Sequence, residues 1–178
     1  MKIVFVVMIF AASASASASA LGPSFRAAQA CGPRDASFRV TLDESQPTLK
    51  PAEPGKATVY FVLDDGPWGQ YQHYVLKVGL DGAWVGAYKR NSYFTVSVEP
   101  GEHHVCANVQ SNSSAGTLLA LAHFTAEPGK VYYFRTQFLA GTRALYPAQS
   151  LLALDPLDSD EAKYLIASYP LSVSQTNK

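Results

Sequence analysis

Alternation of apolar and polar side chains is the main pattern along this chain, and it predicts a series of short β-strands. Phe38, Val40 and Leu42 alternate with polar residues, which is typical of a strand with one buried face. Further runs rich in β-branched and aromatic residues predict strands at 56–63, 74–80, 83–89, 93–98, 102–110, 118–126, 131–138 and 149–154. Residues 117–122 alone could form a helix, but the flanking turn residues favour a strand. The order predicts a meander of antiparallel strands.

Two kinds of turn punctuate these strands. Asp81-Gly82 separates two strand-like runs and suits the positive φ angles of a type I′ hairpin turn. Glu-Pro-Gly stands directly before a strand at 53–55, 99–101 and 127–129, where Pro and Gly fit the central positions of a type II turn. The recurrence is explained by shared turn chemistry, with an internal duplication as the alternative.

Helical spacing occurs only near the carboxyl end of the chain. Asp158 and Glu161 form a capping-box pattern, and Pro170 marks the end of the segment. The polar residues 174–178 are expected to fray. The predicted fold is therefore all-β, an antiparallel two-sheet β-sandwich in the style of immunoglobulin-like or transthyretin-like domains, with one short C-terminal helix.

The amino-terminal segment has the pattern of a secretory signal peptide. Lys2 precedes the apolar run 3–12, and small residues lead to a cleavage point after Ala20. A buried helix is the alternative, and the apolar run is too short to span a bilayer. A second possible cut follows Ala30, where the match to a lipidation signal is poor. We therefore divide the chain into a signal peptide at 1–20, a lead at 21–36, a single sandwich domain at 37–173 and a tail at 174–178.

The composition supports a folded domain and narrows its partners. The chain is 48% hydrophobic and 16% charged, which is typical of a globular protein with a substantial core. Lys and Arg together number 14, as do Asp and Glu. This balance argues against nucleic acid or an anionic membrane as the main partner, because both require a basic excess.

Export determines how the two cysteines are interpreted. In an oxidising compartment Cys31 and Cys106 most simply form a disulfide. In the chain-entropy model, closing a loop of this length stabilises the fold by about 4 kcal/mol. A metal pair or a catalytic thiol is disfavoured because no third soft ligand lies nearby in the sequence.

The histidines are the candidates for metal binding. His103 and His104 are neighbours on a predicted strand, so their side chains should point to opposite faces. Either could meet His123 across strands, but no known metal motif accompanies them. Surface or turn-stabilising histidines are the favoured interpretation, and we expect no cofactor.

The sequence lacks a catalytic motif that we can identify. It contains no G-x-S-x-G elbow and no Gly-rich phosphate loop. The carboxylates at Asp64-Asp65 and at 155–161 are explained by a turn and by a helix amino terminus. A non-catalytic protein is therefore favoured over an enzyme.

Aromatic residues near the hairpin suggest a binding surface. Trp84, Gly86 and Tyr88 are expected to share one face of the hairpin, with Trp68 nearby in the sequence. Exposed aromatic platforms hold ligands in many proteins, which makes Trp68, Trp84 and Tyr88 candidate ligand-binding residues. Core packing is the alternative for Trp84.

Several of these segments together resemble a known family. The motifs are Asp81-Gly82, Trp84-Val85-Gly86, Ser92-Tyr93-Phe94, Pro100-Gly101-Glu102-His103 and Pro128-Gly129-Lys130-Val131-Tyr132-Tyr133. As a set, over about residues 50–172, they resemble the exported bacterial domain-of-unknown-function family 2846. Cys31-Gly32-Pro33 is also similar to relatives in which Cys-Gly-Pro follows the signal peptide. The resemblance implies a bacterial, envelope-side protein and brings no activity or catalytic residues.

The sequence thus predicts an exported protein, periplasmic or extracellular, with no transmembrane segment in the mature chain. We interpret it as a non-catalytic binding or structural module of the bacterial cell envelope, with an envelope protein or glycan as its partner and no nucleic acid. The alternative is a small metal-dependent or hydrolytic envelope enzyme that uses His103, His104 or His123.

Overall fold

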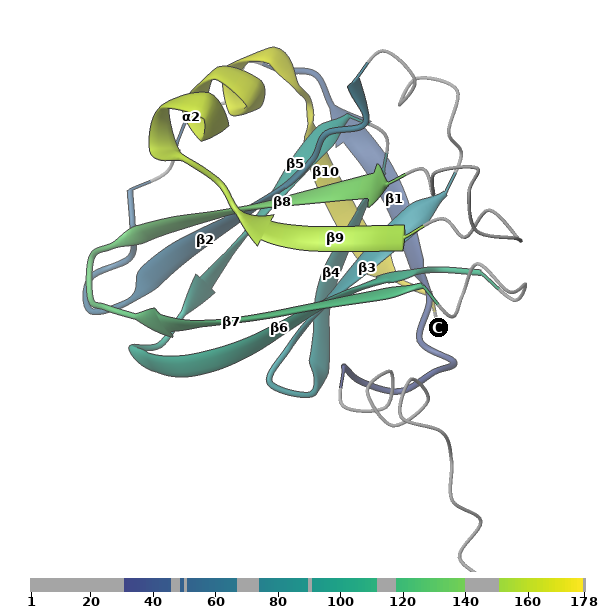
Figure 1. Cartoon of the computed structure of the whole chain (residues 1–178), viewed down its shortest axis with the longest axis horizontal. Coiled ribbons are helices and arrows are strands. Elements are labelled where there is room, and N and C mark those ends of the chain that lie inside the picture. The colour runs from purple at the N-terminus through teal and green to yellow at the C-terminus, as the bar shows by residue number, and fades with distance from the viewer. Residues whose placement is uncertain are drawn as a thin grey trace, which may run out of the picture.

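Over the residues that it describes, the computed structural model of the chain contains two packed β-sheets and one helix (Figure 1). It describes residues 31–45, 49, 51–66, 74–89, 91–111, 118–139 and 151–177. Sheet A has six strands in the order β1-β10-β5-β2-β8-β9, and sheet B has four in the order β4-β3-β6-β7. The strands are β1 Phe38–Asp43, β2 Ala57–Leu63, β3 Val75–Leu80, β4 Ala83–Lys89, β5 Ser92–Val98, β6 Gly101–Val109, β7 Leu119–Ala126, β8 Val131–Leu139, β9 Leu151–Pro156 and β10 Leu171–Thr176.

The predicted all-β sandwich with a short C-terminal helix is confirmed, but two details of its topology are wrong. Sheet A is mixed rather than antiparallel, because β2 pairs with β8, and β10 with β5, in parallel. The chain is also not a simple meander, since β2 and β3 lie in different sheets, as do β4 and β5. Side-chain alternation identifies a strand and its buried face but carries no information about its neighbours.

The centre of the core is β2, which is buried along its whole length. Val59, Phe61 and Leu63 face the space between the sheets, where Phe61 stacks against aromatic rings of β5 and β8. Tyr60 and Val62 point to the outer face of sheet A and are covered by the helix. A strand buried on both faces reads as a continuous apolar run, as this one does.

Helix α2, Ser159–Ser168, covers the outer face of sheet A over its central strands β2, β5 and β8. The carboxylate of Asp158 accepts hydrogen bonds from the backbone N–H groups of Asp160 and Glu161 at 2.9 and 3.3 Å, which confirms the predicted amino-terminal cap. The Glu161 carboxylate pairs with Arg135 of β8 at 2.6 Å, so the cap also ties the helix to the sheet. No helix among the described residues is long and apolar enough to cross a bilayer.

The expectation of a frayed tail from residue 174 is wrong for residues 174–176, which belong to β10. This strand pairs antiparallel with β1 over six residues. It is anchored where the Ser172 hydroxyl lies 2.8 Å from that of Ser92 in the interior. Its polar composition resembled a disordered tail because its interior contacts are made by small polar side chains.

The turns largely follow the sequence. Asp81 and Gly82 have φ angles of 51° and 83°, which confirms the type I′ hairpin between β3 and β4. Gly55 and Gly129, with φ of 82° and 75°, fit type II turns that precede the parallel neighbours β2 and β8. Gly101 differs, with φ of 137°.

Candidate functional site

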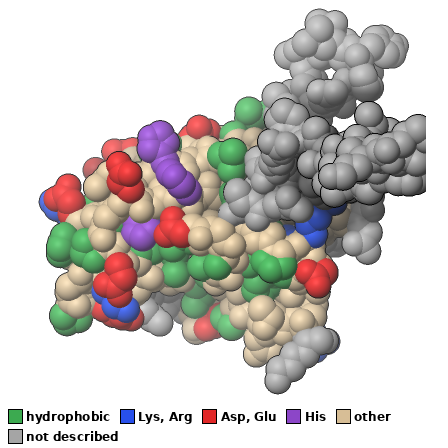
Figure 2. Space-filling view, turned by 90° about the horizontal axis from the view of Figure 1, so that it is seen from below, with side chains coloured by type: hydrophobic (Ala, Val, Ile, Leu, Met, Phe, Trp, Pro, Cys, Tyr) green, Lys and Arg blue, Asp and Glu red, His purple; other side chains and the backbone are tan. Residues whose placement is uncertain are grey.

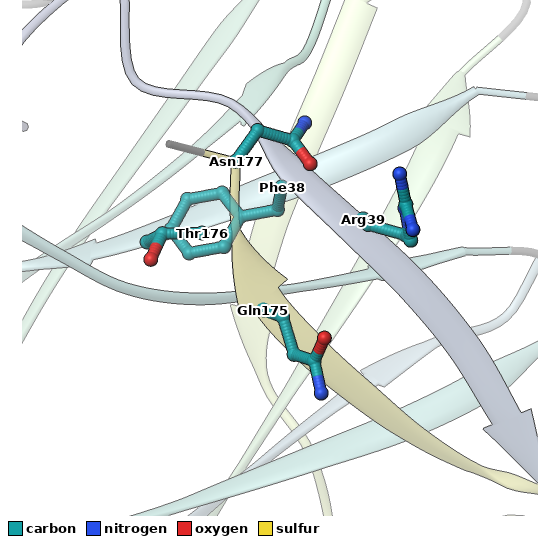
Figure 3. Close-up of a pocket in the computed structure, with 5 residues that line it drawn as sticks. All are labelled: Phe38, Arg39, Gln175, Thr176 and Asn177. Atoms are coloured by element: carbon teal, nitrogen blue, oxygen red, sulfur yellow. The ribbon is translucent and has the colours of Figure 1, made fainter.

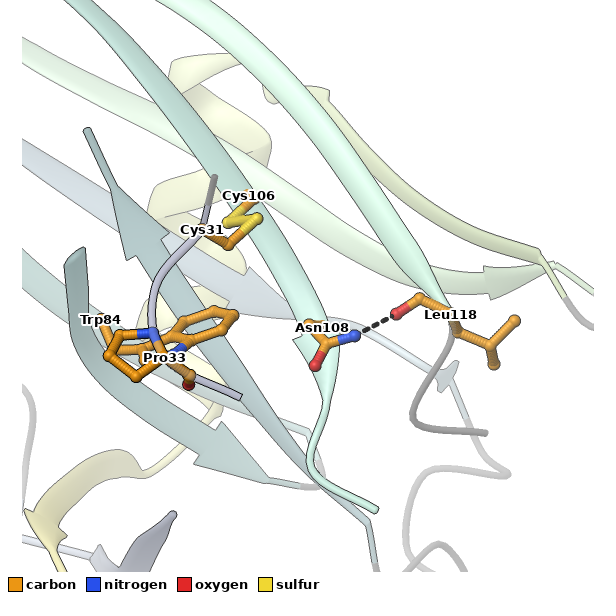
Figure 4. The surroundings of a disulfide bond; sticks show 6 residues. All are labelled: Cys31, Pro33, Trp84, Cys106, Asn108 and Leu118. Carbon is orange, nitrogen blue, oxygen red and sulfur yellow. Dashed lines mark hydrogen bonds between the residues drawn. A yellow bond between two sulfur atoms is a disulfide. The ribbon is translucent and has the colours of Figure 1, made fainter. Parts of the chain in front are cut away.

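The outer face of sheet B is divided into a covered half and an uncovered half among the described residues. Residues 31–36, the described part of the lead and called the lead segment from here on, lie over β3, β4 and β6 (Figure 4). They are held there by the predicted disulfide between Cys31 and Cys106. Phe38 and Val40 of β1 pack against Ala87 of β4 on the same side. The covered half therefore carries its own small apolar cluster, separate from the central core.

The disulfide brings the lead segment into close contact with β3. The Cα atoms of Cys31 and Cys106 are 5.8 Å apart. Gly79 lies directly beneath them, and a Cβ atom at this position would stand 2.5 Å from the carbonyl oxygen of Cys31. Only glycine permits this approach without rearrangement.

Trp84 and Lys77 fasten the rest of the lead segment. The Trp84 indole N–H donates to the Pro33 carbonyl at 2.7 Å (Figure 4), and the Lys77 ammonium donates to the Ala36 carbonyl at 3.0 Å. The ammonium also lies 4.3 Å from the centroid of the Trp84 ring, a cation–π contact. Burial lowers the pKa of Lys77. Sequence reasoning missed Lys77, because a lysine that alternates with apolar strand residues is typical of a solvent-facing position.

The uncovered half lies on β6 and β7, and we call it the open face: Glu102, His104, Leu121, His123 and Thr125. The antiparallel register places Glu102 opposite Thr125, and His104 opposite His123. Leu121 lies opposite the disulfide-bonded Cys106 and is 59% exposed. Figure 2 views the molecule from the side of these strands and shows histidine side chains gathered beside acidic ones. Among the large apolar side chains of the described strands, Leu121 is the most exposed.

The structure separates the predicted aromatic site. A β-bulge at Val78/Gly79 shifts the register of the hairpin. Trp84 and Tyr88 therefore lie on different faces of the hairpin, contrary to the prediction. Trp84 points to the lead segment, whereas Tyr88 is fully buried between the sheets with its hydroxyl hydrogen-bonded to Thr136. Trp68 lies outside the described residues. A ligand-binding role for these three side chains stays a prediction.

The histidines are placed as their sequence positions predicted. His104 and His123 face each other on the open face, while His103 points to the opposite side of β6. The His103 ring lies 2.7 Å from the Asp81 carboxylate and 2.7 Å from the Glu99 carbonyl oxygen. Within the described part of the chain, no group of three or more metal-ligating side chains comes together.

A second polar cluster lies at the end of β2. Asp64 accepts a hydrogen bond from the Tyr169 hydroxyl at 2.7 Å, and Asp65 accepts one from the Tyr74 hydroxyl. Burial raises the pKa of Asp65 and also raises the pKa of Tyr74. Asp64 also accepts from the Gly66 backbone N–H at 3.2 Å, as expected for the predicted turn. These partners give both carboxylates a structural role.

A shallow hollow lies at the end of the β1–β10 ribbon (Figure 3). Its walls are polar apart from one ring, and its side chains spread outward rather than converging on one point. It is lined by Phe38, Arg39, Gln175, Thr176 and Asn177. The geometry gives no specific ligand-binding arrangement.

Comparison with protein families identifies one match. The family model described as "Protein of unknown function (DUF2846)" matches residues 53–147, which contain β2 to β8 and therefore the whole open face. Comparisons with curated proteins and with solved structures find no match.

Proposed function

The chain belongs to the DUF2846 family of proteins of unknown function, and we propose that it is an exported, non-catalytic binding module of the bacterial cell envelope. The observation that carries the proposal is the open face of sheet B. α2 covers the outer side of sheet A over β2, β5 and β8, and the lead segment and β1 cover β3 and β4. Within sheet B, the open face is the part of the outer surface that the described residues leave uncovered, and Leu121 gives it an apolar centre.

Export is supported by the amino-terminal sequence and by the disulfide. Residues 1–20 have the charge, apolar run and small residues of a signal peptide, although they lie outside the described residues. A disulfide that fastens the lead segment persists in an oxidising compartment such as the periplasm or the extracellular space. Fractionation of cells that express the full chain should find the protein outside the cytoplasm. Deletion of residues 1–20 should retain it inside.

The proposed partner is an envelope protein or glycan. Equal numbers of acidic and basic side chains argue against nucleic acid. The open face carries a leucine, two imidazoles and a threonine hydroxyl, which can make both apolar contacts and hydrogen bonds.

The enzymatic alternative has less support from the arrangement of the histidines. Both ring nitrogens of His103 are already engaged by Asp81 and Glu99, which gives this ring a structural role. His104 and His123 remain accessible, but no nucleophile with a base beside it was identified in the sequence.

The test is binding by matched surface variants. Leu121→Asp places a charge at the centre of the open face, whereas Tyr164→Asp places the same charge at a 71% exposed position on α2. The immobilised mature protein should capture a specific protein or glycan from the envelope fraction of its own cell. That capture should be lost with Leu121→Asp and kept with Tyr164→Asp. Equal capture by both variants, or no specific capture by the unmodified protein, would refute the proposed surface.

A further inference from the structure

The histidine pair on the open face has the geometry of a small metal site. His104 and His123 are directly opposite each other in the β6–β7 ladder, and both side chains are exposed on the same face. Directly opposite residues in an antiparallel pair have Cβ atoms about 4.5–5.5 Å apart. Two imidazoles at this separation can turn toward one ion, since metal–nitrogen bonds are about 2.0–2.1 Å long.

The charges around the pair favour a cation. Asp81 lies beside His104, and its carboxylate accepts the backbone N–H of His104 at 2.9 Å. Glu102 lies two residues before His104 on the same face. Neither β6 nor β7 contains a lysine or arginine that would repel a positive ion. The two rings thus stand in a neutral to acidic setting.

We propose that His104 and His123 together bind a divalent transition-metal ion at the open face, Cu(II) more tightly than Ni(II) or Zn(II). Imidazole is a good ligand for these ions, and copper leads the general order of affinity for nitrogen ligands. No third metal-ligating side chain of the described residues joins the pair. The other coordination positions are therefore open to water or to a donor from another molecule. The inference goes beyond the proposed partner binding and does not depend on it.

Untagged mature protein titrated with Cu(II) tests the site directly. We expect one ion per chain and an electron paramagnetic resonance spectrum with nitrogen ligation. Loss of one ligand removes the advantage of two linked donors, so His104→Ala and His123→Ala should each weaken binding roughly 100-fold. Both positions are exposed, so thermal unfolding should show that the variants keep the wild-type fold.

An exchange variant separates the geometry from the number of histidines. His123→Thr combined with Thr125→His keeps the composition but moves the second ring opposite Glu102, a diagonal about 7–8 Å from His104. We expect at least about tenfold weaker binding, a difference of about 1.4 kcal/mol. The inference is overturned if wild-type protein binds no stoichiometric Cu(II), or if either alanine variant or the exchange variant binds it as tightly. Partner capture by the Leu121→Asp variant is scored separately, so the two proposals fail independently.

Discussion

At the scale of single residues, His103 shows how the environment fixes the charge of a side chain. Its ring contacts the Asp81 carboxylate and the Glu99 carbonyl oxygen, and both groups can only accept hydrogen bonds. Both ring nitrogens must therefore carry a proton to satisfy both contacts. Burial on its own lowers the pKa of His103, but the bond to Glu99 and the bond and charge of Asp81 outweigh it, so the pKa is raised.

This pKa shift predicts a pH dependence of stability. A histidine whose pKa is raised on folding contributes its full stabilisation below the unfolded value of about 6.5, and the contribution is lost as the pH rises through the folded value. His103→Gln should therefore destabilise the protein by about 1.5–3 kcal/mol near pH 5.5, the usual contribution of hydrogen bonds to a charged group. The difference from wild type should shrink above neutral pH. Urea unfolding at several pH values measures it.

His104→Gln is the matched control, since it removes the neighbouring histidine from the exposed side of the same strand. His104→Gln should leave unchanged the pH-dependent contribution of His103 to the free energy of unfolding. A His103→Gln variant whose destabilisation is the same at pH 5.5 and pH 8.5 would contradict the charged contact.

At the scale of elements, the sequence predicts strands well and their partners poorly. Alternation located the strands, and Asp81-Gly82 and Asp158 placed a hairpin and a helix start, because these signals act through local backbone geometry. The parallel pairing of β2 with β8 joins residues more than seventy positions apart and leaves no local signal.

In the candidate site, too, the features set by local strand geometry were predictable from the sequence, and those set by distant segments were not. The opposite faces of His103 and His104 follow from strand geometry. The pairing of His104 with His123 is one of the two pairings that the sequence allowed. The bulge that parts Trp84 from Tyr88 depends on how the hairpin packs. The exposure of Leu121 was not foreseen, because it depends on where the distant lead segment lies.

The strand β10 gives a prediction at this scale. A chain that ends at Pro170 leaves β1 without its partner and uncovers Phe38 and Val40, which are 6% exposed in the full chain. Burial of such side chains contributes roughly 1.5–3 kcal/mol each, so we expect a loss of roughly 3–6 kcal/mol or failure to fold. Chemical denaturation, or proteolysis if the protein folds poorly, measures the loss.

Deletion of Lys178 alone is the control, because this residue follows β10. It should match the full chain in stability. If truncation at Pro170 also matched the full chain, β10 would not be part of the folded core.

At the scale of the whole molecule, segments near both ends of the described chain complete the sandwich. α2 covers the central strands of sheet A, the lead segment and β1 cover half of sheet B, and β10 bridges β1 to β5. Among the described residues, this covering reaches the disulfide, and the outer faces of β6 and β7 beyond it stay exposed. The position of Cys106 on β6 thus sets the boundary between the structural half of sheet B and the half available for binding.

Reduction of the disulfide is therefore expected both to destabilise the protein and to release the lead segment from sheet B. Labelling of the denatured, unreduced protein should find no free thiol, since Cys31 and Cys106 are bonded to each other. Reduction should lower the free energy of unfolding by about 4 kcal/mol in the chain-entropy model. The Trp84 fluorescence should change as Pro33 moves away from the indole. The Cys31→Ala/Cys106→Ala variant should show the lower stability and the changed Trp84 fluorescence without reductant, and reductant should change neither. Two labelled cysteines in the unreduced protein would contradict the bond. An unchanged Trp84 signal after reduction would show instead that the lead segment stays in place without it, held by its own hydrogen bonds to β3 and β4.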